Sequence, residues 1–474
     1  MDRRSKIIVS VLLCIVCLSI LSLTIFRPTT AKVYHKLLQS YTEANAQADV
    51  NKLYQYTPES SETTDLTDVR LPEALPLSNE EEILYMDTVG QLLQEDLWNK
   101  RDMYDASNYL MVPMHYAFRS GDIEKIEAFH RFFARWFESI NGDDVYAFSE
   151  QPASVNIFQF YYFCCEYLRL CSISGELSSV PDGFYDFLYC QVEYQYTEVP
   201  GNWNSEKNYL SRAEQILLHK EYPYHYYSAL TDMDLFPLAA LCDLRIVSQF
   251  TGEGHTELLD RAAMLAYRMY TDMTLVTETE KGGYLFQVGV WRDHKDYAYA
   301  GNVEITKNIQ PCIREDIVSD SSHFIRHALW LTSFQQAQIY QEQYDLFQLR
   351  REELANQLIN YVIQYVDGKP LATTFMDGTF GVYRYSYNTE GVGHQGYSLS
   401  GTLLLGWWSF LDDSRITKVY ENILAQFPMS AGVENPYFDY ATTREQNRFF
   451  DADTAFDNGM MECMVMLAAK LGVE

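Results

Sequence analysis

The chain has 474 residues, and its 65 acidic side chains against 36 basic ones give a formal net charge of −29. A field of this sign repels nucleic acid and anionic lipid surfaces, so nucleic-acid binding is not expected. It also disfavours a strongly anionic substrate unless a local basic pocket overrides it. Aromatic residues make up 15% of the chain and include 37 tyrosines. Tyrosine suits a wet concave surface as well as a helical core, because its ring stacks while its hydroxyl forms hydrogen bonds.

The first predicted element is an apolar run, Ile7–Phe26, that follows a short cationic start at residues 1–6. At about 1.5 Å per residue, a helix of this length covers the hydrocarbon core of a bilayer. A cleavable signal peptide usually has a shorter apolar core and a small-residue cleavage site, and Thr29–Ala31 is a poor candidate for one. The basic residues before the run predict a cytoplasmic tip and an extracellular remainder. We expect a retained single-pass anchor in the cell membrane, with cleavage as the alternative.

Residues 27–77 are predicted to be a juxtamembrane segment and linker, and residues 78–474 a single extracellular domain. A helix is possible over residues 32–55, whereas residues 57–77 are rich in Pro, Ser, Thr and Glu, which is typical of a linker. The domain begins at a capping box, Ser78–Glu81, followed by apolar residues at helical spacing.

Two kinds of helix then alternate along the chain. One kind starts with a polar turn and continues into apolar residues, near Asp105, Ser154, Asp232, Asp320, Gly396 and Asp451. The other kind is amphipathic and charged, as outward-facing helices are, over residues 122–139, 255–270, 349–365 and 414–427. Six such alternations predict a mainly all-α fold of paired helices in a ring, without a strict sequence repeat. Two stretches interrupt this pattern and are predicted to form hairpins or long loops, at 282–318 and 372–394.

This alternation resembles the (α/α)6 toroids found among glycoside hydrolases and polysaccharide lyases. The resemblance is architectural, covers about residues 80–474, and includes no complete family motif. In that group the inner helices begin around a shared cleft, and their first turns and preceding loops supply the site. Unsatisfied N–H groups and positive helix-dipole ends also gather where helices begin. The resemblance implies a glycan-active enzyme with a polysaccharide or oligosaccharide as its partner.

The richest candidate cluster lies in and just after the first interruption. His323 follows a predicted helix cap at Asp320 or Ser319 and is a catalytic candidate. The resemblance implies that a lyase would use a His or Tyr near an Asn or Arg to take the proton beside a uronate carboxylate. The alternative for His323 is a polar helix-start residue bonded to a loop carbonyl. The candidate substrate-binding residues are Trp291, Arg292, Tyr297, Tyr299, Asn302 and Arg326.

A second cluster consists of four carboxylates in the last predicted inner helix, Asp451, Asp453, Asp457 and Glu462, of which Asp453 and Asp457 are the catalytic candidates. One of them would act as general acid, with a partner from another inner helix, because an inverting hydrolase needs two carboxyl groups about 6.5–9.5 Å apart. Asp105, Asp232 and Asp234 are the possible partners. The alternative is that the helix dipole offsets the like-charge pair and the cluster has no catalytic role.

A third cluster lies in a Gly-rich loop that enters another inner helix and supplies Glu390, His394 and Tyr397. Its alternative is a plain connector. His323 and His327 share one helix face, but no third metal ligand is evident, so neither a metal nor another cofactor is expected. Trp407 and Trp408 are predicted to be core residues, and the seven cysteines outside the anchor small buried hydrophobes.

These observations favour a membrane-anchored glycan-active enzyme, with a glycoside hydrolase preferred as the broader class. A polysaccharide lyase is the first alternative. A non-catalytic scaffold that binds glycan or surface-polymer assembly proteins is the second, and an open helical solenoid is the third.

Overall fold

The computed structural model describes residues 49–60, 62–64, 69–98, 102–140, 155–218, 221–252, 256–272, 277–286, 291–384, 391–432, 434–438, 449 and 454–472. The chain divides into two compact units, Met1–Tyr56 and Thr57–Glu474. In the first unit, residues 49–53 are helical. The predicted membrane span at residues 7–26 and the tip before it lie outside the described residues. Within the described ranges, no helix is long and apolar enough to cross a bilayer.

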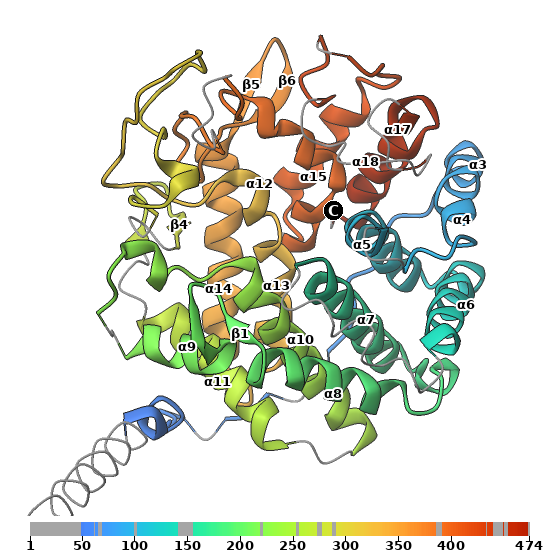
Figure 1. Cartoon of the computed structure of the whole chain (residues 1–474). Coiled ribbons are helices and arrows are strands. Elements are labelled where there is room, and N and C mark those ends of the chain that lie inside the picture. The colour runs from blue at the N-terminus through green and yellow to red at the C-terminus, as the bar shows by residue number, and fades with distance from the viewer. Residues whose placement is uncertain are drawn as a thin grey trace, which may run out of the picture. The chain divides into compact units, whose positions relative to one another are not determined.

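The second unit is mainly helical, which confirms the predicted class (Figure 1). The predicted polar starts at Ser154 and Asp451 lie outside the described residues. The other predicted starts correspond to members of a set of helices with largely buried residues. These are α5 (Asp102–Ser120), α7 (Val155–Ser174), α10 (Asp232–Thr251), α12 (Ser321–Phe324), α13 (His327–Gln336), η6 (Ser398–Leu405), η7 (Trp407–Leu411), α17 (Thr454–Asp457) and α18 (Met460–Leu471). Side-chain caps explain two of the starts, because Thr231 forms a capping box with Asp234 and Asp320 caps α12.

A second set of helices has amphipathic or more exposed sequences. It comprises α3 (Asn79–Asp87), α4 (Val89–Leu92), α6 (Ile123–Ile140), α8 (Phe184–Thr197), α9 (Tyr209–Leu217), α11 (Thr256–Asp272), α14 (Gln341–Gln357) and α15 (Ser414–Leu424). In Figure 1, α6 lies at the right edge and α8 and α11 along the bottom, outside α5, α7 and α10. Short helical turns occur at η2 (Leu177–Ser179), η3 (His225–Ser228), η4 (Lys295–Tyr297) and η5 (Leu358–Val362).

The buried helices contact one another in succession. α5 packs on α7, α7 on α10, α10 on α13, and α13 on η7; η6 and η7 pack on α18, and α18 packs back against α5. The second set covers them, with α6 on α5, α8 on α7 and α10, α11 on α10, α14 on α13, and α15 on α18. The succession of contacts therefore returns from the last buried helix to the first.

The described strands form three antiparallel pairs: β1 (Pro200–Gly201) with β2 (Asn204–Asn208), β3 (Thr277–Glu278) with β4 (Tyr284–Leu285), and β5 (Ile363–Val366) with β6 (Lys369–Ala372). In the last pair Ile363 lies opposite Ala372 and Val366 opposite Lys369. The predicted interruptions at 282–318 and 372–394 are mostly loop in their described parts. Isolated bridges join Asp320 to Phe375 and Tyr383 to His394, so the second loop is tied to the start of α12.

Two sequence predictions about helices differ from the structure. The helix expected over residues 349–365 begins at Gln341 and ends at Gln357, and Ile363–Val366 is strand β5. The sequence did not distinguish the two, because a short apolar run fits the spacing of a helix and that of a strand. The helix expected after Gly396 is instead a pair of 3-10 helices separated at Gly406, whose φ is 79°. A Cβ at Gly406 would lie 2.9 Å from the Ala468 side chain, so glycine allows α18 to approach closely.

The part of residues 57–77 that the structure describes belongs to the second unit and is hydrogen-bonded to it. The Thr64 N–H donates to the Ile339 carbonyl at 2.8 Å, and the Leu75 N–H donates to the Lys470 carbonyl at 2.9 Å. The Arg119 Nε donates to the Pro72 carbonyl at 2.8 Å.

Trp407 and Trp408 are buried, as predicted. The seven cysteines that the structure describes are unpaired, and the prediction of burial is confirmed for Cys164, Cys165, Cys171, Cys242 and Cys463. It is wrong for Cys190 and Cys312, which are exposed. A position on a helix face or in a loop, rather than residue type, decides whether a small thiol is covered.

Candidate functional site

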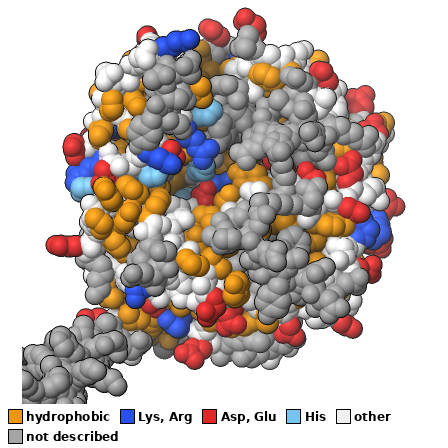
Figure 2. Space-filling model, in the orientation of Figure 1, with side chains coloured by type: hydrophobic (Ala, Val, Ile, Leu, Met, Phe, Trp, Pro, Cys, Tyr) orange, Lys and Arg blue, Asp and Glu red, His pale blue; other side chains and the backbone are white. Residues whose placement is uncertain are grey.

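A cavity of about 470 Å³ lies where α5, α10 and α12 begin. Its lining combines side chains from these helix starts with others from the loops before and after them. It brings together five of the predicted site residues, namely Asp232, Trp291, Tyr297, His323 and Arg326. It also includes Tyr104, Trp203, His294, Asp296, Asp320, His327, Tyr383 and Arg384. Figure 2 shows Lys, Arg and His side chains gathered beside an apolar patch near the start of α12.

Asp320 and His323 form a close pair at the start of α12. The Asp320 carboxylate accepts hydrogen bonds from the backbone N–H groups of Ser322 and His323, at 3.1 and 3.0 Å, and from the Ser322 hydroxyl. His323 Nδ1 lies 2.9 Å from Asp320 Oδ1, and the Tyr297 hydroxyl donates to Oδ2 at 3.3 Å. His323 thus contacts this carboxylate and not the loop carbonyl of the alternative interpretation.

The charge on Asp320 fixes the tautomer of His323. Burial alone would raise the pKa of Asp320, but the His323 charge and hydrogen bond, the Ser322 hydroxyl and the backbone N–H outweigh it, so its pKa is lowered. An ionised carboxylate only accepts hydrogen bonds, so His323 Nδ1 carries the proton in the pair. In the neutral ring, Nε2 then holds the lone pair and is able to accept a proton.

Tyr383 and Arg384 complete this part of the cavity. Arg384 Nε donates to the Tyr383 hydroxyl at 3.1 Å, and Arg384 Nη2 lies 3.4 Å from His323 Nε2. The Tyr383 hydroxyl lies 3.3 Å from His323 Nδ1. Arg384 adopts a φ of 53°, which is uncommon outside glycine and concentrates at functional sites. Its N–H donates to the Asp296 carbonyl at 3.1 Å, which holds this backbone in place.

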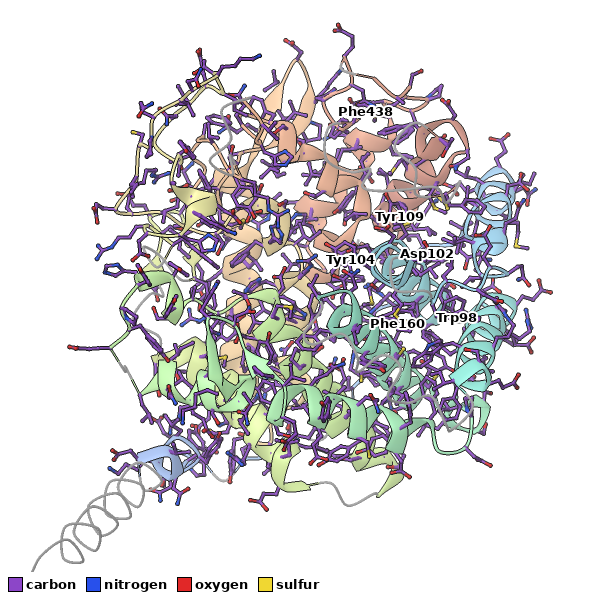
Figure 3. The ribbon with its side chains drawn as sticks, viewed as in Figure 1. Trp98, Asp102, Tyr104, Tyr109, Phe160 and Phe438 are labelled. Carbon is purple, nitrogen blue, oxygen red and sulfur yellow. The ribbon has the colours of Figure 1, made fainter. Side chains whose placement is uncertain are left out.

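A second polar group connects three buried helices. Arg326 forms an ion pair with Asp232 at the start of α10, and its Nη2 donates to the Tyr104 hydroxyl at 2.6 Å. The Arg326 guanidinium also lies 5.3 Å from the centre of the Phe236 ring. The Arg326 side chain is only 5% exposed, whereas Asp232 is 19% exposed toward the cavity. Figure 3 shows Tyr104 on α5 toward the centre of the view. These contacts position a cation in the cavity wall.

Aromatic rings form another side of the cavity. Trp291 stacks on Tyr297, with ring centroids 5.2 Å apart, and Trp203 meets Trp291 edge-on at 6.1 Å. Trp203 has a φ of 59°, so it is the second cavity residue in the left-handed region. His294 packs between Trp203 and Tyr226, and burial lowers its pKa. Such a wall suits the apolar faces of a ligand whose polar groups reach the charged side.

His327 lies one turn after His323 and lines the same cavity, but its surroundings are apolar. Its ring stacks on Phe324 at 3.8 Å, and the residue is 6% exposed. Burial lowers its pKa to about 3, and the neighbouring Arg326 charge acts in the same direction. His327 is therefore a neutral, packed ring.

Several predicted site residues lie elsewhere. Among the described residues, the cavity lining does not include Arg292, Tyr299, Asn302, His394, Tyr397 or Asp457. Tyr299 is buried with Ala298 and Val382, because the loop packs its rings inward. The Tyr397 hydroxyl donates to Gln364, and Asp457 is exposed at the end of α17. Asp453 and Glu390 lie outside the described residues.

The remaining three make their contacts from outside the cavity lining. Arg292 forms an ion pair with Glu315 at 2.8 Å and contacts His225. Asn302 donates to the Gln310 carbonyl at 3.1 Å, so it stabilises its own loop. The His394 backbone pairs with Tyr383, and their ring centroids are 6.5 Å apart.

Sequence reasoning did not select Tyr104, Trp203, Tyr383 or Arg384 as site residues. Tyr383 and Arg384 belong to the second interruption, and their loop position was the only signal in the sequence. Trp203 follows β1 in a short hairpin, and a pattern of apolar residues gives no indication that it faces a cavity.

Comparisons with known proteins find no matching family model and no significantly similar curated protein or solved structure. Within the described part of the chain, no group of three or more His, Cys, Asp or Glu side chains is arranged to hold a metal ion. The chemistry of the site is therefore argued from its geometry.

Proposed function

We propose that this chain is a polysaccharide lyase that cleaves a uronate-containing glycan by β-elimination. The observation that carries the proposal is the Asp320–His323 pair, in which Asp320 holds Nδ1–H and leaves Nε2 as a base beside Arg384. A uronate carboxylate supplies the anion that a guanidinium binds, and it acidifies the adjacent C5–H that a base must remove. The aromatic wall supports the sugar ring on the other side.

In the proposed reaction, the guanidinium of Arg384 binds the uronate carboxylate and stabilises the charge that develops on it. His323 Nε2 takes the C5 proton, and the C5–H electron pair becomes the C4=C5 double bond. The C4–O bond breaks, and its electrons leave on the glycosidic oxygen. We assign the donation of a proton to that oxygen to the Tyr383 hydroxyl, which accepts a hydrogen bond from Arg384. The products are an unsaturated uronate end and a saturated chain, and no oxidant or reductant is consumed.

Glycoside hydrolysis is the second candidate, and Asp232 favours it because this carboxylate is partly exposed to the cavity. Its ion pair with Arg326, and the commitment of Asp320 to His323 and to two N–H groups, leave the carboxylates poorly suited to act as general acid. Holding a carboxylate ionised is the opposite of what a general acid requires.

The proposal includes the wider organisation of the chain. We take the succession of buried helices that returns from α18 to α5 as support for an (α/α)6-type toroid, and as an argument against an open solenoid. Residues 7–26 would anchor the protein as a single-pass membrane protein with the site outside the cell. That position suits action on a surface polymer as it emerges, alongside assembly proteins.

The test uses the purified full chain and a panel of polymers: polygalacturonate, alginate, hyaluronan, heparosan and neutral glucans. We expect ultraviolet absorbance from the C4=C5 bond with at least one uronate polymer and none with the neutral glucans. New reducing ends without this absorbance would identify a hydrolase. No cleavage of any member would favour the non-catalytic scaffold.

A further inference from the structure

The aromatic wall of the cavity continues outward along η3. Trp203, in the cavity, meets Tyr226 edge-on at 5.1 Å and stacks parallel to Tyr227 at 6.2 Å. Tyr224 stacks on Tyr226 at 5.5 Å and packs on Tyr227 at 5.2 Å. These four residues form a continuous row of rings, which we call the aromatic track.

The track differs from an aromatic core because its outer end faces water. Tyr224 is 48% exposed, and no residue of η3 is buried. Exposed aromatic rings leave apolar surface in contact with water unless a ligand or partner covers them. A contiguous row of such rings therefore marks an interaction surface more often than a single exposed ring does. Rings of this kind cover the apolar faces of a ligand while their hydroxyls remain available for hydrogen bonds.

The track is also held rigidly on the cavity. Asp293 accepts hydrogen bonds from the backbone N–H groups of His225 and Tyr226, at 2.8 and 3.1 Å, and contacts His225 Nδ1 at 3.1 Å. Burial alone would raise the pKa of Asp293, but these N–H groups and His225 outweigh it, and its pKa is lowered. Three contacts from one carboxylate fix η3 onto the segment that carries Trp291. A surface fixed before binding costs less entropy to use.

We propose that the aromatic track binds sugar units beyond the one held in the cavity, so that the preferred substrate is a polymer rather than a short oligosaccharide. This inference rests on the proposed function and specifies its substrate class. The cavity of about 470 Å³ encloses only a short piece of a chain, and a longer glycan leaving along the track would pass over Trp203, Tyr226 and Tyr224 in turn.

The test compares Tyr224→Ala with Tyr194→Ala on α8, a matched control whose tyrosine is 43% exposed and outside the track. Both variants are assayed on a polymer that the full chain cleaves and on the tetrasaccharide from it. We expect Tyr224→Ala to raise KM for the polymer roughly 2- to 10-fold, the effect of one aromatic contact, with kcat unchanged and the tetrasaccharide unaffected. Tyr194→Ala should match the wild type. If KM rises equally for both substrates, or does not rise for the polymer, the proposed role of the aromatic track is overturned.

A binding assay separates failure of the track from failure of the proposed function. Retardation of each variant in gels that contain the same polymers is measured without reference to cleavage. Weaker retardation of Tyr224→Ala, in a chain that cleaves nothing, would support the track and reject the lyase. Cleavage by the wild type with equal retardation of all variants would reject the track alone. If no polymer retards the wild type, the track is rejected as well.

Discussion

The substitution Asp320→Asn isolates the feature on which the mechanism depends. Asparagine caps helices about as well as aspartate, so the N–H groups of Ser322 and His323 keep an acceptor and α12 keeps its start. The amide, however, presents an NH₂ as well as an oxygen to His323 Nδ1. If the NH₂ faces the ring, Nδ1 becomes an acceptor and the proton moves to Nε2, where it blocks proton abstraction.

The expected loss follows from the role of the base. General base catalysis contributes about 10²- to 10⁴-fold, so disabling Nε2 should lower kcat by that factor, or about 3–5 kcal/mol in activation free energy. KM should change little, because Arg384 and the aromatic wall are untouched. Replacing a buried charge-assisted contact should cost only about 1–3 kcal/mol of unfolding free energy.

Two assays check this prediction. Elimination is followed by ultraviolet absorbance, and the tautomer of His323 by nitrogen chemical shifts in NMR, which requires no substrate. The matched control is Asp413→Asn, because Asp413 caps α15 through the Arg415 N–H at 2.8 Å and does not line the cavity. A variant that changes the tautomer but retains wild-type kcat would refute the assignment of Nε2 as the base. An unchanged tautomer would refute the pairing argument itself.

Three further outcomes are expected. Arg384→Gly should lower kcat/KM at least about 10²-fold without lowering the melting temperature, because glycine relieves a strained φ worth about 1–3 kcal/mol. Asp367→Gly, at a φ of 51° in the β5–β6 turn, should leave activity unchanged, and an Arg384→Gly variant that is fully active or that melts at a lower temperature would contradict this account. Asp232→Asn should cost no more than roughly tenfold in kcat for a lyase, since one charge-assisted contact to Arg326 is lost; abolished cleavage would point to a hydrolase. His327 has a pKa of about 3 when folded, below the ordinary value of about 6.5. Burying this neutral ring therefore leaves the folded state at full stability above a pH of about 6.5. As the pH falls toward 3, the unfolded state gains a proton on His327, and the free energy of unfolding decreases by at most about 5 kcal/mol. In His327→Phe, the free energy of unfolding measured by urea titration should therefore vary less with pH in this window. The same pH dependence as in the wild type would count against the prediction.

The sequence predicted the helical class and the helix starts well, because these depend on local signals. Polar turns before apolar runs marked the beginnings of α10 and α12, and Asp320, one of the two residues predicted to cap α12, is its N-cap. His323, Arg326 and Asp232 followed from those starts, since helix beginnings that meet at one cavity bring their first turns together. Local capping chemistry thus led to three of the residues that line the cavity.

The loop residues could not be located in the same way. Tyr383 and Arg384 approach His323 only because residues 374–376 pair with the segment before α12, a contact between distant parts of the chain. Tyr299 and Tyr297 are two positions apart and equally attractive in sequence, yet Tyr299 is packed with Val382 and Tyr297 faces the cavity. Composition carries no information about which of two neighbouring rings turns inward.

The central claim, that His323 removes a proton to form a double bond, is tested most directly by proton NMR of the products. The full chain and the variant His323→Ala are incubated with one uronate polymer that the wild type cleaves. We expect a resonance from the C4 olefinic proton in the wild-type products. In the variant, this resonance should appear at a rate at least about 10²-fold lower. New reducing ends without an olefinic resonance would contradict the mechanism. So would an olefinic resonance that appears in His323→Ala at the wild-type rate.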